Sequence, residues 1–141
     1  MIRQIDRVML ASTEGELMAD KPTVCIIDKD AAVCDSLSHL LATLDVAVEI
    51  YACAEDFLRE SLASTRCCVI TELYLPGING IELLEELRAR GIAIPTIVLA
   101  SNSDVPTAVR AMRAGAIDFI DKPFVDRVLL NRIRHILAHR Y

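Results

Sequence analysis

Charged side chains follow three apolar stretches of the sequence, at the points where each stretch ends. Asp28 ends "TVCIID", Glu72 follows "CVIT", and Lys122 is the second residue after "AIDFI". A carboxylate at the tip of an apolar run loses much of its hydration, and a partner must compensate for that loss. Acids and a lysine that meet at one edge of a fold therefore predict a functional site in which carboxylates are neutralised by cations.

The apolar stretches alternate with segments that carry apolar residues at helical spacing. Short runs such as "TVCIID" and "TIVLA" are typical of strands that are covered on both faces. After the first strand, Val33, Leu37 and Leu41 recur at helical spacing, and Asp30 is placed to cap a helix. The predicted strands are 23–28, 46–52, 68–71, 96–100 and 116–120, and a helix is predicted to begin near residues 30, 54, 80, 104 and 125.

Specific side chains of the last two predicted helices are expected to face the core. The first of these helices is opened by Asp104 and Pro106, and its Val109 and Met112 are expected to point inward. In the final helix, the expected inward residues are Val128, Leu129, Ile133, Ile136 and Leu137.

Strict alternation of five strands with five helices predicts an α/β fold with a parallel sheet and helices on both faces. In such sheets, functional groups collect outside the carboxyl ends of the strands, at the topological switch point. Asp28, Glu72 and Lys122 all belong to that edge. Sheets of this kind also hold nucleotides there, so a small-ligand-binding module is an alternative, although the first strand lacks a following Gly-rich loop.

Composition limits the classes of function. The chain has 141 residues, 53% of them hydrophobic and 4% aromatic, which predicts one domain with an aliphatic core. A net charge of -5 gives no footprint for nucleic-acid binding. No apolar run approaches the ~18 residues of a membrane span, and the N-terminus lacks a signal-peptide stretch. We therefore expect a cytoplasmic protein without nucleic-acid or membrane partners.

The remaining features concern the thiols and the N-terminus. The five cysteines are an odd number without a C-x-x-C pair, so we interpret them as reduced thiols. Residues 1–20 precede the repeated pattern and are expected to form an N-terminal extension, with Thr13 and Glu16 as a candidate capping box. Residues 21–141 are expected to form the single domain.

With these residues in view, the chain resembles the receiver domain of bacterial two-component response regulators. The resemblance covers about residues 22 to 140 and is closest to receivers of the nitrogen-fixation, LuxR-type class. Its main stretches are "VCIIDKDAAV", "CVITELYLPGINGIELLEELR" and "PTIVLASNSDVPTAVRAMRAGAIDFIDKPF". The resemblance implies a flavodoxin-like (βα)5 fold, a doubly wound five-stranded parallel sheet with strand order 2-1-3-4-5.

The resemblance also implies the roles of individual residues. Receivers accept a phosphoryl group from a histidine kinase on an aspartate at the end of strand three, and two acids after strand one hold Mg²⁺ with it. Asp28 matches the first of these acids, and the carbonyl of Tyr74 matches a further metal ligand. Lys122 matches the lysine that pairs with the phosphoryl group, and Pro123 matches a proline that usually follows a cis peptide bond. Phe119 matches the aromatic residue that reports the switch.

Three positions depart from the family pattern. Lys29 stands in place of the second acid, Glu72 in place of the phosphoacceptor aspartate, and Ala100 in place of the hydroxyl residue that ends strand four. A reading shifted by one residue would use Asp30 and Ser101 instead. That shift would turn each strand's side chains to the opposite face, and Asp30 already has a role as a helix cap.

These departures argue against phosphotransfer. Magnesium requires oxygen ligands in octahedral geometry, and Lys29 removes one oxygen. A glutamate nucleophile reaches one methylene too far, and a misplacement of ~1 Å can cost ~10²-fold in rate. We therefore expect no bound cofactor, no enzymatic activity, and a phosphorylation-independent pseudo-receiver. Phosphorylation at Glu72 or Asp30 is the alternative, and both an active-like locked state and an inert scaffold remain open.

Two further expectations concern the site. The carboxylates and lysines at the four matching positions sum to zero charge, so Lys29 is expected to extend toward Glu72 and replace the metal. Because Ala100 leaves room beneath strand four, Phe119 is expected to be buried and inward.

The expected partners are proteins, either a histidine kinase or another regulator. A homodimer is expected to form through the fourth helix, the fifth strand and the fifth helix, with contacts from Arg110, Arg113, Asp118 and Arg127. The final helix also has a basic face, which is read either as a solvated surface or as a docking face; it comprises Arg127, Arg132, Arg134, His135, His139 and Arg140.

Overall fold

The computed structural model describes residues 21–60 and 66–139. The predicted N-terminal extension, including Thr13 and Glu16, lies outside the described residues. The described strands are β1 (Thr23–Ile27), β2 (Ala47–Tyr51), β3 (Arg66–Glu72), β4 (Thr96–Ala100) and β5 (Asp118–Asp121), and the described helices are α3 (Ala31–Leu41), α4 (Ala54–Arg59), α5 (Gly80–Ala89), α6 (Val105–Ala114) and α7 (Asp126–Ala138).

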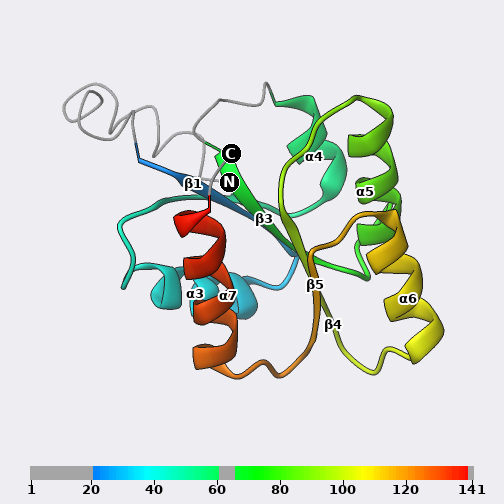
Figure 1. Ribbon diagram of the computed structural model, residues 1–141. Coiled ribbons are helices and arrows are strands. Elements are labelled where there is room, and N and C mark those ends of the chain that lie inside the picture. The colour runs from blue at the N-terminus through cyan, green and yellow to red at the C-terminus, as the bar shows by residue number, and fades with distance from the viewer. Residues whose placement is uncertain (1–20, 61–65, 140–141) are drawn as a thin grey trace.

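All five strands run parallel in the order β2-β1-β3-β4-β5, which confirms the predicted topology. Helices α3 and α7 cover one face of the sheet, and α4, α5 and α6 cover the other (Figure 1). The chain first passes from β1 to β2 on one side of β1, and then crosses to β3 on the other side of β1. The carboxyl ends of β1 and β3 therefore form the switch point at which a site is expected.

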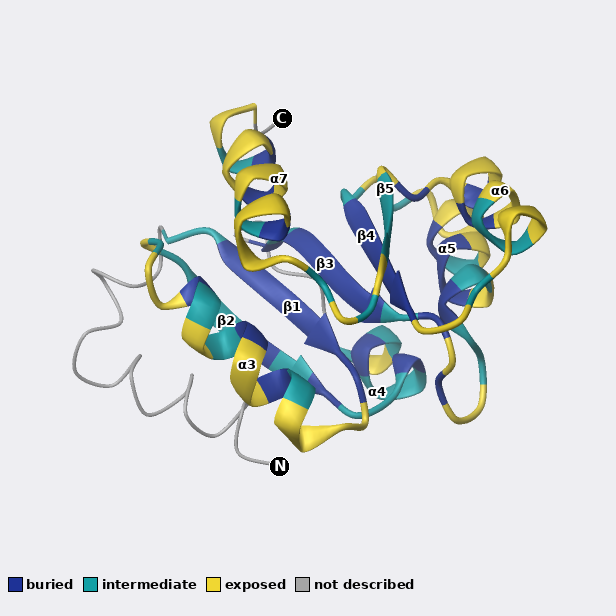
Figure 2. Cartoon of the chain, turned by 90° about the horizontal axis from the view of Figure 1, so that it is seen from below, coloured by how far each residue is buried: buried dark blue, intermediate teal, exposed yellow. Residues whose placement is uncertain are grey.

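Burial follows the position of each strand in the sheet. Every residue of β1 and β4 is buried, as continuous apolar runs between two helical layers require (Figure 2). The edge strands β2 and β5 are covered less completely. The partial burial of β2 is the pattern expected of an edge strand.

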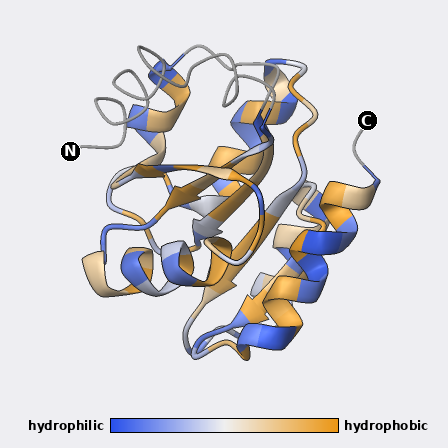
Figure 3. Cartoon of the chain, turned by 90° about the vertical axis from the view of Figure 1, so that its left-hand side faces the viewer, coloured by the Kyte–Doolittle hydropathy of each residue, from blue (hydrophilic) through white to orange (hydrophobic). Residues whose placement is uncertain are grey.

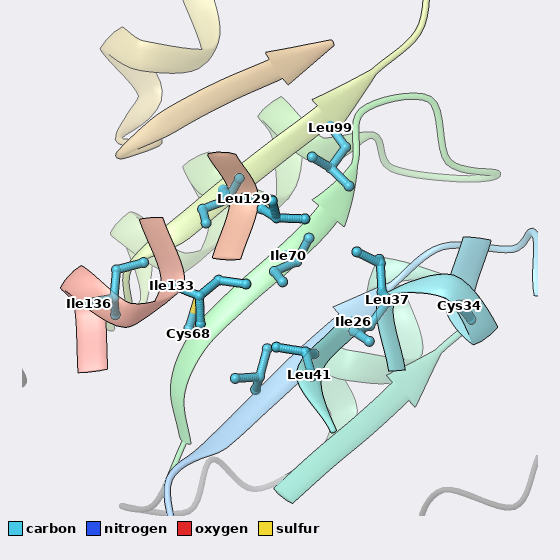
Figure 4. Packing of buried hydrophobic residues seen from close by; sticks show 12 residues of the cluster. Ile26, Cys34, Leu37, Leu41, Cys68, Ile70, Leu99, Leu129, Ile133 and Ile136 are labelled. Carbon is cyan, nitrogen blue, oxygen red and sulfur yellow. The ribbon is translucent and has the colours of Figure 1, made fainter. Parts of the chain in front are cut away.

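The core beneath α3 and α7 is built almost wholly from aliphatic residues (Figure 4). Leu37 and Leu41 of α3 and Leu129 of α7 meet side chains from β1, β3 and β4. Burying one such side chain completely contributes about 1.5–3 kcal/mol relative to leaving it exposed. This cluster fixes the positions of the strands whose ends carry the site.

A buried ion pair interrupts the apolar core on the opposite face. Arg66 donates from Nε and Nη2 to Glu49 Oε1 at 2.9 and 2.6 Å, and both side chains are almost fully buried. The Tyr51 hydroxyl donates to the same oxygen at 2.8 Å, and the Arg66 guanidinium lies 5.9 Å from the Phe57 ring centroid. Burial, followed by the hydrogen bond to Glu49, raises the pKa of Tyr51. The sequence analysis did not identify this cluster.

Side-chain caps define the starts of three helices. Asp30 accepts hydrogen bonds from the N–H groups of Ala32 and Val33, and Asp104 caps α6, as the sequence predicted. Asn79 and Glu82 form a capping box at the start of α5, which the sequence analysis did not predict. These caps satisfy backbone donors that the first turn of a helix leaves without partners.

The predicted core face of α6 is wrong, and so is one residue of the predicted core face of α7. Val109 and Met112 of α6 are exposed, and the buried residues of that helix are Ala111 and Ala114. Small alanines allow α6 to lie close to its neighbours, whereas the prediction followed the more hydrophobic residues. Val128 of α7 is likewise exposed, although Leu129, Ile133 and Ile136 are buried as expected.

All five cysteines are free thiols, as the sequence indicated. Cys25, Cys34 and Cys68 are buried, whereas Cys53 and Cys67 are partly exposed. Burial, together with the charge of Asp28, raises the pKa of Cys34 to about 11. Within the described residues, no helix is long and apolar enough to cross a membrane.

Candidate functional site

Three charged residues from separate segments meet at the carboxyl edge of the sheet. Lys122 Nζ donates to Asp28 Oδ2 at 2.8 Å and also to Glu72 Oε1. The side chains are 4% exposed for Asp28, 11% for Glu72 and 14% for Lys122, so solvent screens their interaction only partly. The predicted convergence of these three residues is present in the structure.

The position of Glu72 is set by β3. This residue ends the strand and pairs in register with Leu99 of β4, so its side chain emerges at the carboxyl edge. Its second oxygen, Oε2, accepts the backbone N–H of Tyr74 at 2.9 Å. Gly80 packs closely against the backbone of Glu72, since a Cβ at position 80 would lie 3.0 Å from the carbonyl oxygen of Glu72. Both oxygens of Glu72 are thus engaged by protein donors.

Asp28 is fixed by the turn between β1 and α3. Its backbone N–H donates to the Tyr51 carbonyl at 3.0 Å, which continues the pairing of β1 with β2. Its Oδ1 accepts the N–H of Asp30 at 2.9 Å, and its carbonyl accepts the thiol of Cys34 at 3.3 Å. The carboxylate is therefore held in one orientation toward Lys122.

Lys122 precedes Pro123, and the peptide bond between them is cis, as the resemblance implied. The backbone N–H of Lys122 donates to the Ala100 carbonyl at 2.8 Å, which places the residue directly after β5. Burial lowers the pKa of Lys122, but hydrogen bonds and charges from Asp28 and Glu72 outweigh it, so the pKa is raised. The lysine is a cation held by two acids.

Lys29 does not take the position expected of it. The residue is exposed, and among the described residues it forms no ion pair with Glu72. The prediction that Lys29 replaces the metal beside Glu72 is therefore wrong. Lys29 lies in the bend that follows β1, and its side chain is exposed there.

The switch positions lie next to one another on β4 and β5. Ala100 is fully buried, and Phe119 packs against the same cluster while remaining partly exposed. The expected inward direction of Phe119 is thus met, but the expected complete burial is not. Ser101 is exposed, and Asp30 is occupied as a helix cap, so neither matches the shifted reading.

The loop after β3 is anchored by a residue that the sequence analysis did not single out. Glu55 of α4 accepts the N–H of Ile78 through Oε2 at 3.0 Å, and that hydrogen bond lowers the pKa of Glu55. Gly77 has a φ of 75°, and a Cβ there would lie 2.1 Å from Glu55 Oε2. The run "LPGING" signals a turn, but it does not reveal a partner 23 residues away.

The described residues do not fit the Mg²⁺ that the resemblance implies. Mg²⁺ requires near-octahedral oxygen coordination at about 2.0–2.1 Å. Asp28 and Glu72 supply carboxylates, but Lys122 lies between them and Lys29 replaces the remaining acid. Tyr74 donates its N–H to Glu72, and no group of three or more acidic, His or Cys side chains in the described residues could hold a metal.

One groove among the described residues lies away from this site. It has a volume of about 360 Å³ and is lined by residues including Leu87, Arg88 and Ile94, near the C-terminal ends of α5 and α6. None of its lining residues belongs to the strand-end cluster. The small-ligand alternative therefore stays a prediction.

Comparison with known proteins identifies a family and related sequences. A family model described as "Response regulator receiver domain" matches residues 24–134. The transcriptional regulatory protein FixJ of Azorhizobium caulinodans is 42% identical over 121 residues, and FixJ of Rhizobium meliloti is 40% identical over 117 residues. These alignments cover 86% and 83% of this chain but 57% of each relative, so the chain spans little more than half their length.

Solved structures give the same result. A response regulator receiver protein from Pseudoalteromonas atlantica is 44% identical with a TM-score of 0.79, covering 83% of this chain and 98% of that one. The structure titled FixJ-N is 39% identical with a TM-score of 0.74, covering 85% and 96%.

Proposed function

Because the chain belongs to the response regulator receiver domain family, we propose that it serves two-component signalling as a pseudo-receiver that binds proteins without being phosphorylated. The observation that carries this proposal is the state of Glu72 at the phosphoacceptor position. Its two oxygens are engaged by Lys122 and by the N–H of Tyr74. The glutamate side chain also carries this carboxylate one methylene further from β3 than an aspartate would, and a displaced nucleophile reacts slowly.

The neighbouring positions support the same conclusion. Phosphoryl transfer depends on positioning the reacting atoms and on neutralising the developing charge. Lys29 supplies no metal ligand, and Ala100 supplies no hydroxyl to a phosphoryl oxygen. Phe119 already packs against the cluster that contains Ala100, so its position needs no phosphoryl group. We propose that the site is structural rather than catalytic.

The surface proposed for docking comprises α6, β5 and the start of α7. The exposed apolar residues on these elements, or directly before them, are Val105, Val109, Met112, Ile117, Val125 and Val128. Exposed charged residues such as Arg110, Arg113 and Arg127 lie in the same segments, and hydrophilic residues line the outer side of α7 (Figure 3). Apolar residues ringed by charges are typical of a transient protein interface. A second copy of the chain or another regulator is the proposed partner. FixJ is named as a transcriptional regulatory protein, and we propose that this chain would influence transcriptional regulation only through such a partner.

Incubation with acetyl phosphate and Mg²⁺, followed by intact mass spectrometry, tests the proposal. We expect no mass increase corresponding to a phosphoryl group. A phosphorylated product would overturn the proposal, and peptide mapping would then assign the modification to Glu72 or Asp30. A known receiver domain phosphorylated in the same buffer is the positive control.

A further inference from the structure

The last turn of α7 carries two histidines that the strand-end cluster does not use. His135 lies within the helix, and His139 caps its C-terminal end four positions later. Both residues are exposed, and their ring centroids lie 4.2 Å apart with 31° between the ring planes. Because α7 runs back across the sheet after β5, this end of the helix lies away from the carboxyl edge of the strands (Figure 1).

The hydrogen bond of His139 leaves one of its ring nitrogens ready to bind a metal ion. Nδ1 of His139 lies 2.9 Å from the backbone carbonyl oxygen of His135. A carbonyl oxygen can only accept a hydrogen bond, so Nδ1 carries the proton and Nε2 of the neutral ring keeps its lone pair. Histidines that bind metals almost always donate their second ring N–H in this way, because the hydrogen bond fixes the tautomer and the orientation of the ring.

We infer that His135 and His139 form a binding site for a divalent transition-metal ion such as Zn²⁺ or Ni²⁺. Residues four positions apart lie on the same face of a helix. Two Zn–N bonds of about 2.0–2.1 Å let one ion join nitrogens up to about 4 Å apart, and rotation of these exposed side chains can bring the two rings to that spacing. Because no group of three or more potential ligands occurs in the described residues, water completes the coordination.

The charges around the two histidines permit a cation at this position. The C-terminal end of a helix carries a partial negative charge, which stabilises cations in the last turn. Arg132 is already paired with Asp118 at 2.8 Å. Arg134 is adjacent to His135 in the sequence, but successive residues of a helix are rotated by about 100°, so the two side chains leave the helix in different directions.

The chemistry of the ligands determines which ions bind. Imidazole nitrogens suit Zn²⁺ and Ni²⁺, whereas Mg²⁺ prefers oxygen ligands. The site therefore differs in kind from the Mg²⁺ site implied at the strand ends, and it does not depend on whether Glu72 accepts a phosphoryl group. It gives part of the basic face of α7 a role in addition to those of a solvated surface or a docking surface.

The experiment is a calorimetric titration of the chain, prepared without a histidine affinity tag, with ZnCl₂ and with NiCl₂ at about pH 7.5, where histidine is mostly neutral. His135→Ala and His139→Ala each remove one ligand. His39→Ala is the matched control, because His39 is the one other histidine and is exposed on α3. We expect one ion to bind per chain. Each site substitution should weaken binding at least about tenfold, since losing a group that only orients a ligand already costs about 10–100-fold.

Binding that stays unchanged when both His135→Ala and His139→Ala are present would overturn the inference, as would the absence of binding to the native protein. Because the variants keep all five thiols, binding through cysteine alone would give the first of these results. NMR spectra of the histidine rings with Ni²⁺, which is paramagnetic, provide a second readout. The signals of His135 and His139 should broaden before that of His39, and equal broadening of all three would contradict the proposed site.

Discussion

Lys122 and Glu72 lie 50 residues apart in the sequence and share a hydrogen bond at the carboxyl edge of the sheet. The same ammonium reaches Asp28 at 2.8 Å. Despite the opposing effect of burial, the two acids raise the pKa of Lys122 above the ordinary lysine value. The stability of the fold is therefore linked to the protonation of this one side chain.

This linkage predicts how stability depends on pH. A group whose pKa is raised on folding contributes fully below its unfolded pKa, and the contribution is lost as pH rises through the folded value. We expect the free energy of unfolding, measured with urea from about pH 8 to about pH 12, to fall more steeply in the native protein than in Lys122→Met. Tyr51 acts in the same direction but is present in both proteins. Parallel curves would contradict the prediction.

The buried pair of Arg66 and Glu49 gives a prediction about stability. Arg66→Met would leave the Glu49 carboxylate buried without its cation, which should destabilise the protein by about 3–5 kcal/mol. The double substitution Arg66→Met with Glu49→Met should cost less than the two single changes together. Arg90→Met is the control, because its pair with Glu86 is 44% exposed on each side and should cost less than about 1 kcal/mol. Equal losses at Arg66 and Arg90, in urea unfolding, would refute this assignment.

Substitutions at two glycines can distinguish the cost of backbone strain from the cost of losing a specific contact. Gly77 and Gly91 have similar φ values of 75° and 71°, but a Cβ would meet Glu55 at Gly77 and nothing within 4 Å at Gly91. Gly77→Ala should therefore destabilise the protein by about 0.5–1.5 kcal/mol more than Gly91→Ala. This difference is the contribution of the hydrogen bond from Ile78 to Glu55, which the new Cβ would displace. In a Glu55→Ala background the difference should vanish. A difference that persists there would show that Glu55 is not its cause.

The proposed docking surface can be tested by charge reversal. Arg113→Glu with Arg127→Glu should weaken self-association in sedimentation equilibrium while leaving the melting temperature nearly unchanged, since both side chains are exposed. Arg59→Glu is the control, because α4 packs beside β2 at the opposite edge of the sheet from β5. Unaltered association with a lowered melting temperature would assign the two arginines a structural role.

Much of the fold could be predicted because its signals are local. The strand at 96–100 agrees with β4, and Asp30 and Asp104 mark helix starts because a cap acts on residues two or three positions away. The orientation of α6 could not be predicted from hydropathy, since Ala111 and Ala114 face the core by virtue of small size. Which face of α6 is buried depends on how close the neighbouring helix lies.

The sequence predicted which residues form the candidate site, but it did not predict which lysine forms ion pairs with the acids. Parallel strands bring Asp28, Glu72 and Lys122 to one edge, and that follows from topology alone. Which lysine reaches the acids depends on side-chain direction after β1, where Lys29 points to solvent. The Glu49–Arg66 pair was missed for a similar reason, because its partners meet only once β2 and β3 both flank β1.

We propose that Lys29, Glu72 and Ala100 together prevent phosphoryl chemistry at this site. The most direct measurement is ¹⁹F NMR of beryllofluoride, a phosphoryl mimic, with the native protein and with the variant Lys29→Asp, Glu72→Asp, Ala100→Thr, each with and without Mg²⁺. We predict no bound-fluoride signal for the native protein and a Mg²⁺-dependent signal for the triple variant. A Mg²⁺-dependent signal from the native protein would contradict the account.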